Sequence, residues 1–163
     1  MISNIDLINI ANKYNIPLNS IFQKNEPSNN IYHGGYIINL DDTNLERGGT
    51  HWTGLYVNDI NHSITYFDSF GFPPSQSTIN WINLINPYYQ NYDMFYNSKQ
   101  IQNIRSGGCG IYSLFFIDFM NKHRQSLPAN KVLKKFLNLF DNDVTKNLTI
   151  LKHLVPYYKV TND

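Results

Sequence analysis

The sequence contains a single cysteine among its 163 residues, which excludes an intramolecular disulfide and is typical of a reducing compartment. Its charges nearly balance, at a net charge of +1, which argues against a strongly electrostatic nucleic-acid binder. No apolar run approaches the roughly 20 residues that span a bilayer. The N-terminal residues also lack the basic start and apolar stretch of a secretory signal. We therefore expect no membrane partner.

Motifs for metals and phosphate-bearing cofactors are missing as well. One cysteine and 5 scattered histidines give no ligand spacing of the zinc type. The glycine-rich stretch 107–110 lacks the Lys-Ser/Thr pair that completes a phosphate-binding loop. The sequence therefore predicts neither a metal site nor a cofactor.

Length and composition favour one packed domain, spanning residues 1–163, with a hydrophobic fraction of 42%. Hydrophobic periodicity, caps and proline positions predict helices near 3–14, 77–85, 110–123, 130–140 and 144–154, and strands at 36–40, 50–57, 63–70 and within 92–104. Residues 110–123 are almost wholly apolar, which is typical of a helix buried at the centre of a domain. The pattern predicts an α+β fold, in which helices pack on a small mixed central sheet.

Residues 50–57 and 63–70 read as the two strands of a hairpin. A symmetric turn centred between Asp59 and Ile60 pairs residues whose numbers add to 119, which sets His51 opposite Asp68. Directly opposite Cβ atoms lie about 4.5–5.5 Å apart, close enough for an imidazole–carboxylate hydrogen bond. A shift of one residue would instead place the two side chains on opposite faces.

The lone cysteine, Cys109, lies among three glycines at the predicted start of the buried helix. The thiolate is the reactive form of a cysteine, and both a helix N-terminus and a neighbouring imidazolium lower the pKa of a thiol. The flanking Gly107, Gly108 and Gly110 leave the backbone accessible to a substrate and permit a tight turn. These features favour a nucleophile, although a buried structural cysteine is the commoner fate of a free cysteine.

His51 and Asp68 are the expected partners of this thiol, as the base and the carboxylate that orients it. None of the other histidines has an obvious carboxylate in register: His33, His62, His123 and His153. Gln102 lies seven residues before Cys109, and its amide is placed to donate to a developing oxyanion. Gln100 is the alternative donor, two positions earlier.

Taken together, these motifs strongly resemble the adenovirus maturation protease (adenain) family of Ulp1-like cysteine proteases. The resemblance rests on Gly-Gly-Thr-His-Trp at 48–52, Tyr-Phe-Asp-Ser-Phe-Gly-Phe at 66–72, and Gln102 followed by Gly-Cys-Gly at 108–110. It includes the chain order His, acid, Gln, Cys, and it covers roughly residues 1–125. The small size and the Asn/Ile-rich composition look like a virophage or Polinton-type protease.

The resemblance assigns the catalytic histidine, acid, oxyanion glutamine and nucleophile to His51, Asp68, Gln102 and Cys109. It implies substrate contacts at Trp52, Gly49 and Gly108. The resemblance implies a viral endopeptidase that cleaves capsid precursors during virion maturation. Because family members cleave after glycine, it also implies cleavage after glycine here. We then expect the protein in the virion and at the assembly site in the host cytoplasm.

This chain departs from the family pattern in two respects, the catalytic acid and the means of activation. The adenovirus enzyme has Glu where this chain has Asp68, and Ulp1-type relatives carry the shorter carboxylate. The adenovirus enzyme is activated by DNA and by a peptide joined through a second cysteine, which this chain lacks. An activating viral peptide or DNA is therefore expected only without disulfide linkage, and the lysine stripe of residues 131–135 leaves DNA open.

Two other functions fit the same sequence. The first is an isopeptidase that removes ubiquitin-like modifiers, of the deSUMOylase or deneddylase type, from host conjugates with the same four residues. The second is a non-catalytic binding module that keeps the fold. The presence of all four expected side chains speaks against the second.

Overall fold

The computed structural model describes residues 2–41 and 51–160. Its α-helices are α1 (Asn4–Lys13), α2 (Gln76–Ile85), α3 (Cys109–Lys122), α4 (Ala129–Leu137) and α5 (Asn147–Leu154). Its strands are β1 (Leu18–Gln23), β2 (Gly34–Asn39), β3 (Trp52–Asn58), β4 (Ser63–Phe67) and β5 (Asp93–Tyr96). Short 3-10 helices complete the path: η1 (Pro87–Asn91), η2 (Val144–Lys146) and η3 (Pro156–Val160).

The strands form one five-stranded sheet in the order β1-β2-β3-β4-β5. The two outer pairs, β1 with β2 and β4 with β5, are parallel, whereas the two central pairs are antiparallel. Helices pack on this mixed sheet, so the predicted α+β class with a helix starting at Cys109 is confirmed.

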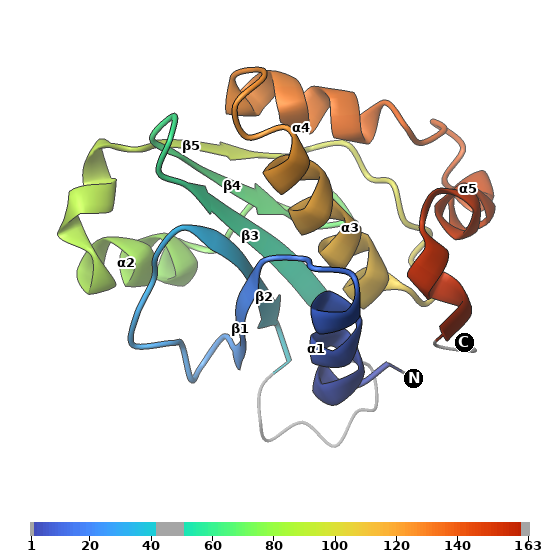
Figure 1. Cartoon of the computed structure of the whole chain (residues 1–163), viewed down its shortest axis with the longest axis horizontal. Coiled ribbons are helices and arrows are strands. Elements are labelled where there is room, and N and C mark those ends of the chain that lie inside the picture. Colours follow the sequence, from blue (N-terminus) through green and yellow to red (C-terminus); the bar gives the residue numbers. More distant parts are fainter. Residues whose placement is uncertain (1, 42–50, 161–163) are drawn as a thin grey trace.

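Helices lie on both faces of the sheet (Figure 1), and an apolar cluster packs against each face. The larger cluster joins α1, α3, α4 and α5 to inward-facing residues such as Tyr56 and Phe67. The smaller one joins α2 and η1 to residues such as Leu55 and Tyr66. Successive residues along each of the strands β3 and β4 point to opposite faces of the sheet, so each strand contributes to both clusters.

Helix α3 lies against β2 and β3 because two glycines make room for it. A Cβ atom on Gly54 would lie 2.8 Å from Cδ1 of Phe116, and one on Gly35 would collide with the side chain of Ile117. This close packing fixes the position of the helix whose first residue is Cys109.

The hairpin of β3 and β4 forms, but its predicted register is wrong by two residues. The observed pairs, such as Leu55 with Tyr66, have numbers that add to 121. The loop has four residues, 59–62, closed by the side chain of Asn58, whose oxygen accepts from the backbone N–H of Ile60 and Asn61. His62 has a φ of 57°, which completes the turn.

The structure differs from the sequence-based expectations at two further points. Strand β1 was not predicted, because its sequence Leu-Asn-Ser-Ile-Phe-Gln does not alternate and every residue is half-buried. The strand expected within 92–104 ends at Tyr96, so Gln100 and Gln102 follow it in an irregular segment instead of lying on a strand.

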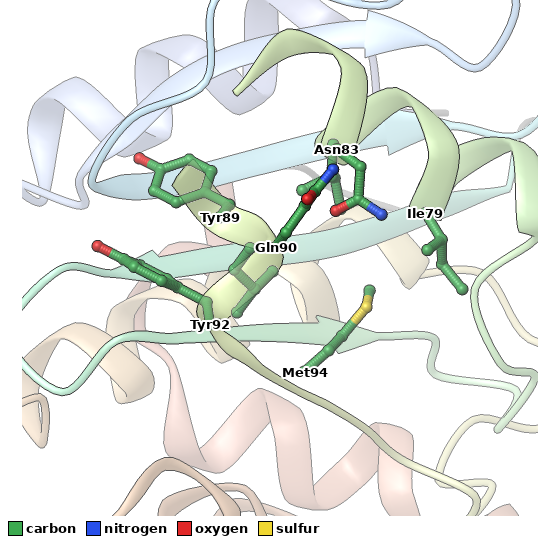
Figure 2. A pocket seen from close by; sticks show the side chains of 8 residues that line it. Ile79, Asn83, Tyr89, Gln90, Tyr92 and Met94 are labelled. Carbon is green, nitrogen blue, oxygen red and sulfur yellow. The ribbon is translucent and has the colours of Figure 1, made fainter. Parts of the chain in front are cut away.

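A pocket on the α2 side of the sheet lies between α2, η1, β4 and β5 (Figure 2). Its lining includes Ile79, Tyr92 and Met94, and none of its lining residues belongs to the predicted site. Within residues 2–41 and 51–160, no helix is long and apolar enough to cross a membrane. The same residues contain no cluster of His, Cys, Asp or Glu that would hold a metal ion.

Candidate active site

Cys109 is the first residue of α3, where the chain turns sharply into the helix. The N-cap residue, Gly108, has a φ of 104°, a conformation that side chains other than glycine rarely adopt. Cys109 is half-buried, so the residue is not fully enclosed in the interior. The helix N-terminus contributes a positive potential at this position.

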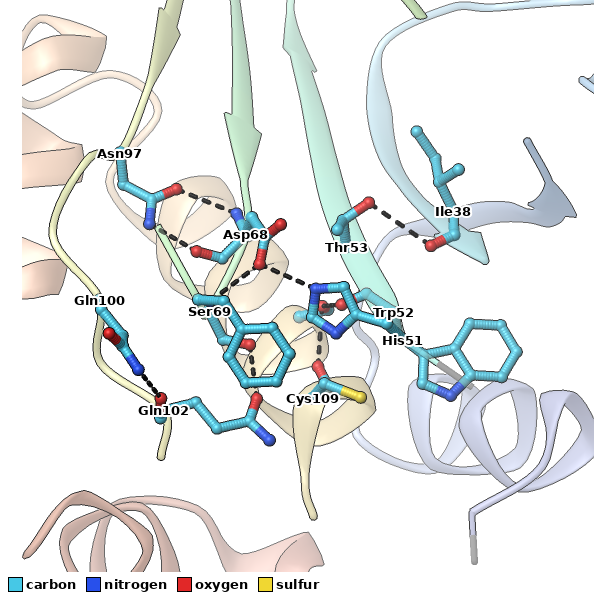
Figure 3. A network of polar contacts seen from close by, with 12 residues as sticks. Ile38, His51, Trp52, Thr53, Asp68, Ser69, Asn97, Gln100, Gln102 and Cys109 are labelled. Atoms are coloured by element: carbon cyan, nitrogen blue, oxygen red, sulfur yellow. Dashed lines mark hydrogen bonds and ion pairs between the residues drawn. The ribbon is translucent and has the colours of Figure 1, made fainter. Parts of the chain in front are cut away.

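His51 lies directly before β3 and faces the carboxylate of Asp68, which directly follows β4 (Figure 3). The imidazole Nε2 is 2.8 Å from Oδ1 of Asp68. The register error of two residues preserved this contact, because a shift of two keeps a side chain on the same face. The two residues are therefore diagonal neighbours instead of directly opposite ones, and diagonal pairs remain within reach of long side chains.

The turn after Asp68 holds its carboxylate in place. Oδ1 also accepts from the backbone N–H of Phe70 at 2.8 Å, and the carbonyl of Asp68 accepts from the N–H of Gly71 at 2.8 Å. Gly71 has a φ of 82°, and a Cβ atom there would lie 2.8 Å from the carbonyl oxygen of Ser98. Only glycine fits this turn, which leaves the Asp68 side chain 2% exposed.

The buried side chain of Asn97 fixes the backbone of Asp68 from the other side. Its Oδ1 accepts from the N–H of Asp68 at 2.9 Å, and its Nδ2 donates to the carbonyl of Asp68 at 2.6 Å. The acid is therefore held by hydrogen bonds to its backbone as well as to its carboxylate.

The ring of Phe70 stacks on the imidazole of His51, with 4.3 Å between ring centroids and 13° between planes. An aromatic face attracts a cation, so this stack favours the protonated imidazole. Phe70 thus contacts the acid through its backbone and the histidine through its ring.

Burial acts to lower the pKa of His51, but its hydrogen bonds and charge interactions with Asp68 and Cys109 outweigh burial and raise the pKa to about 9. Asp68 occupies Nε2, so Nδ1 is the ring nitrogen left for the thiol. At neutral pH the site therefore carries an imidazolium beside the sulfur.

Gln102 is 1% exposed, and both ends of its amide make hydrogen bonds. Oε1 accepts from the hydroxyl of Ser69 at 2.5 Å. Nε2 donates to the carbonyls of Ser106 and Gly107, at 2.8 and 3.1 Å, in the loop that leads to Cys109. Gln100 donates to the carbonyl of Gln102 at 2.9 Å and so supports that segment.

The three residues predicted to contact substrate lie in different surroundings. Trp52 is 3% exposed and is the first residue of β3, directly after His51. Gly108 forms the N-cap beside the nucleophile. Gly49 lies outside the described residues. Their contacts with substrate stay predictions.

The other four histidines make contacts elsewhere. His33 accepts from the N–H of Asp59, His62 stacks on Tyr92, and His123 and His153 bond to carbonyls one turn earlier in their own helices. Of the 5 histidines, His51 is the one that the structure brings to Cys109 and to a carboxylate.

A sequence comparison identifies the family of the chain. Residues 36–147, more than half of the chain, match the model of the Ulp1 protease family, C-terminal catalytic domain. The chain belongs to this family. It is a cysteine protease of the Ulp1 type. A search of curated proteins finds no match.

A solved protease of ASFV shares the fold at low sequence identity, and other solved structures are similar at lower TM-scores. The pS273R protease of ASFV is 19% identical with a TM-score of 0.51, over 86% of this chain and 67% of that one. The Chlamydia abortus effector ChlaDUB is 18% identical with a TM-score of 0.41, over 72% and 64%. The SUMO protease Ulp1 is 12% identical with a TM-score of 0.37, over 74% and 54%.

Sequence reasoning missed three residues that surround the site: Ser69, Phe70 and Asn97. The first two directly follow Asp68, within a motif that was already quoted, so their position was a usable signal. Asn97 gave no such signal in the sequence, because an asparagine after a strand is an ordinary loop residue.

Proposed function

We propose that this protein is a viral endopeptidase that cleaves capsid precursors, after glycine, during virion maturation. The observation that carries the proposal is the convergence of Cys109, His51 and Asp68 in an Ulp1-family fold. The adenain-like motifs and the similarity in fold to a viral protease, pS273R of ASFV, support the viral assignment. A virophage or Polinton-type origin, and action in the virion and at the assembly site, belong to the same proposal.

The arrangement supports a two-step hydrolysis. His51 takes the proton of the Cys109 thiol, and the resulting thiolate attacks the peptide carbonyl. A C–S bond forms, and the carbonyl π electrons move to oxygen. When this intermediate collapses, the C–N bond breaks and the departing amine takes a proton from Nδ1 of His51. Water, deprotonated by His51, then hydrolyses the thioester.

The oxyanion needs donors, and we assign Nε2 of Gln102 together with the helix N-terminus at Cys109. Nε2 faces the loop next to the nucleophile, and its longer contact, 3.1 Å to the Gly107 carbonyl, is the one an oxyanion would replace. Hydrogen bonds of this kind often align fully only in the complex with substrate.

The proposal is tested by co-expression with capsid precursors of the same virus, followed by mass spectrometry of the fragments. The wild-type chain should yield new C-termini at glycine, and Cys109→Ala should yield none. His51→Ala should also be inactive, whereas the control His153→Ala, at an exposed histidine of α5, should cleave like the wild type.

The same variants distinguish the endopeptidase from the alternative function, an isopeptidase. Release of SUMO- or NEDD8-type modifiers from conjugates, with capsid precursors left intact, would favour the isopeptidase. Capsid cleavage that persists in Cys109→Ala would refute the assignment of the nucleophile.

A further inference from the structure

A buried serine next to the acid contacts the amide on which the proposed oxyanion site depends. Ser69 is fully buried, and its hydroxyl donates to Oε1 of Gln102 at 2.5 Å. Ser69 comes from the turn after β4, whereas Gln102 comes from the segment after β5, 33 residues later. This bond therefore ties the turn that holds the acid to the segment that leads to the nucleophile.

The two ends of a glutamine amide differ in chemistry but hardly in shape, and only the nitrogen end can donate to an oxyanion. In Figure 3 the oxygen end of Gln102 points to Ser69, and its nitrogen end donates to the carbonyls of Ser106 and Gly107 in the loop before Cys109. A buried amide oxygen needs a donor, and Ser69 supplies it. Backbone bonds from Ile101 and Gln102 to the carbonyl of Ser69 hold the same two segments together.

We propose that Ser69 is a positioning residue, which fixes the orientation of the Gln102 amide so that its nitrogen end faces the oxyanion. This inference rests on the proposed function, because it concerns the same thiol chemistry. It extends that function by making the residue after the acid part of the oxyanion site.

Two reagents separate this role from a purely structural one. With p-nitrophenyl acetate, the thiolate adds to the carbonyl, an oxyanion forms, and p-nitrophenolate leaves as the thioester appears. With iodoacetamide, a C–S bond forms at the methylene carbon as iodide leaves, and no oxyanion develops. A residue that orients an oxyanion donor affects the first reaction and spares the second.

For Ser69→Ala, we expect the rate of acylation by p-nitrophenyl acetate to fall about tenfold or more, part of the loss expected when an oxyanion donor is removed. Alkylation by iodoacetamide should stay within about twofold of the wild-type rate, because that reaction develops no oxyanion. Both rates are followed at Cys109 by mass spectrometry of the intact chain, and thermal unfolding confirms that the variant is folded.

Ser63, the first residue of β4, offers a matched control. It is also buried, and its hydroxyl donates to an amide oxygen, Oδ1 of Asn61, at the same 2.5 Å, but at the hairpin end of β4. Ser63→Ala removes the same kind of hydrogen bond and should change neither rate at Cys109.

If Ser69→Ala does not fold, Gln102→Met takes its place, with the same selective loss of acylation expected. Where both fold, the double variant should lose no more acylation rate than Gln102→Met alone, because Ser69 acts through that amide. Equal losses in both reactions, or no loss in either, would overturn the proposal. A wild-type Cys109 that reacts with neither reagent would instead refute the proposed function.

Discussion

His51 has a different neighbour at each part of its ring: the Asp68 carboxylate at Nε2, the Cys109 thiol on the Nδ1 side and the Phe70 ring against one face. Asp68 and Cys109 together raise the pKa of His51 to about 9, against the opposing effect of burial. The protonation state of this one ring sets the charge of the whole site.

The contribution of Asp68 to the pKa of His51 is tested by Asp68→Asn, which replaces the carboxylate with an amide of the same shape. This change removes both the hydrogen bond from a charged acceptor and the negative charge, so the pKa of His51 should fall from about 9 towards its ordinary value of 6.5. An NMR titration of the His51 ring measures it. A pKa that stays near 9 in the variant would show that Asp68 is not the cause.

Phe70→Leu tests the stacked ring. A leucine keeps the site covered but has no aromatic face, and the loss of about 0.5–1 kcal/mol of cation–π attraction should lower kcat/KM about two- to fivefold. Phe72→Leu is the control, because Phe72 is an exposed phenylalanine two residues away. Equal effects of both substitutions would contradict a specific role for the stack.

At the scale of the elements, α3 and the β3–β4 hairpin carry the site. Helix α3 places Cys109, the start of β3 places His51 and the end of β4 places Asp68. Their spacing depends on how closely α3 packs on the sheet, and Gly54 sets that distance.

Gly54→Ala should destabilise the protein by about 1–3 kcal/mol, since the new methyl group overpacks the core against the buried Phe116 ring. Gly107→Ala is the matched control, because a Cβ atom there meets nothing within 4 Å. Urea unfolding of both variants measures the difference. A Gly54→Ala variant as stable as Gly107→Ala would refute the packing argument.

The sequence was sufficient to predict the hairpin and the helix at Cys109, but not the register between the strands. Alternation of β-rich residues identifies strands, whereas register depends on the turn. The turn here needs the Asn58 side chain and the left-handed His62, and neither follows from a standard two-residue turn pattern. The contact between His51 and Asp68 tolerated the error only because the shift was even.

The surroundings of Gln102 were less predictable still. Spacing to Cys109 singled out this glutamine, but its burial and its partner Ser69 depend on the return of the chain after β5. Such long-range contacts between irregular segments carry no periodic signal. Strand β1 was missed for a similar reason, because its pairing with β2 overrides a sequence that does not alternate.

At the scale of the whole molecule, the fold class followed from the sequence because the apolar segment after Cys109 has to be buried between sheet and helices. Helix α3 is apolar all round, and nine of its fourteen residues are buried. Cys109 is therefore the first residue of a largely buried helix, which anchors the backbone that carries the thiol.

Global stability should depend on pH through His51. Its folded-state pKa of about 9 lies above the unfolded value of 6.5, so the stabilisation is complete below about pH 6.5 and is lost as the pH rises through 9. The free energy of unfolding should decrease across that window in the wild type and much less in Asp68→Asn. Denaturant unfolding at several pH values measures it, and identical slopes would contradict the linkage.

The central claim is that His51 activates Cys109, and the rate of Cys109 alkylation by iodoacetamide at pH 7 tests it most directly. The account predicts that His51→Ala slows alkylation about tenfold or more, because a thiol without an imidazolium partner is mostly protonated at that pH. His153→Ala, the control, should react like the wild type. A His51→Ala variant that is alkylated at the wild-type rate would contradict the account.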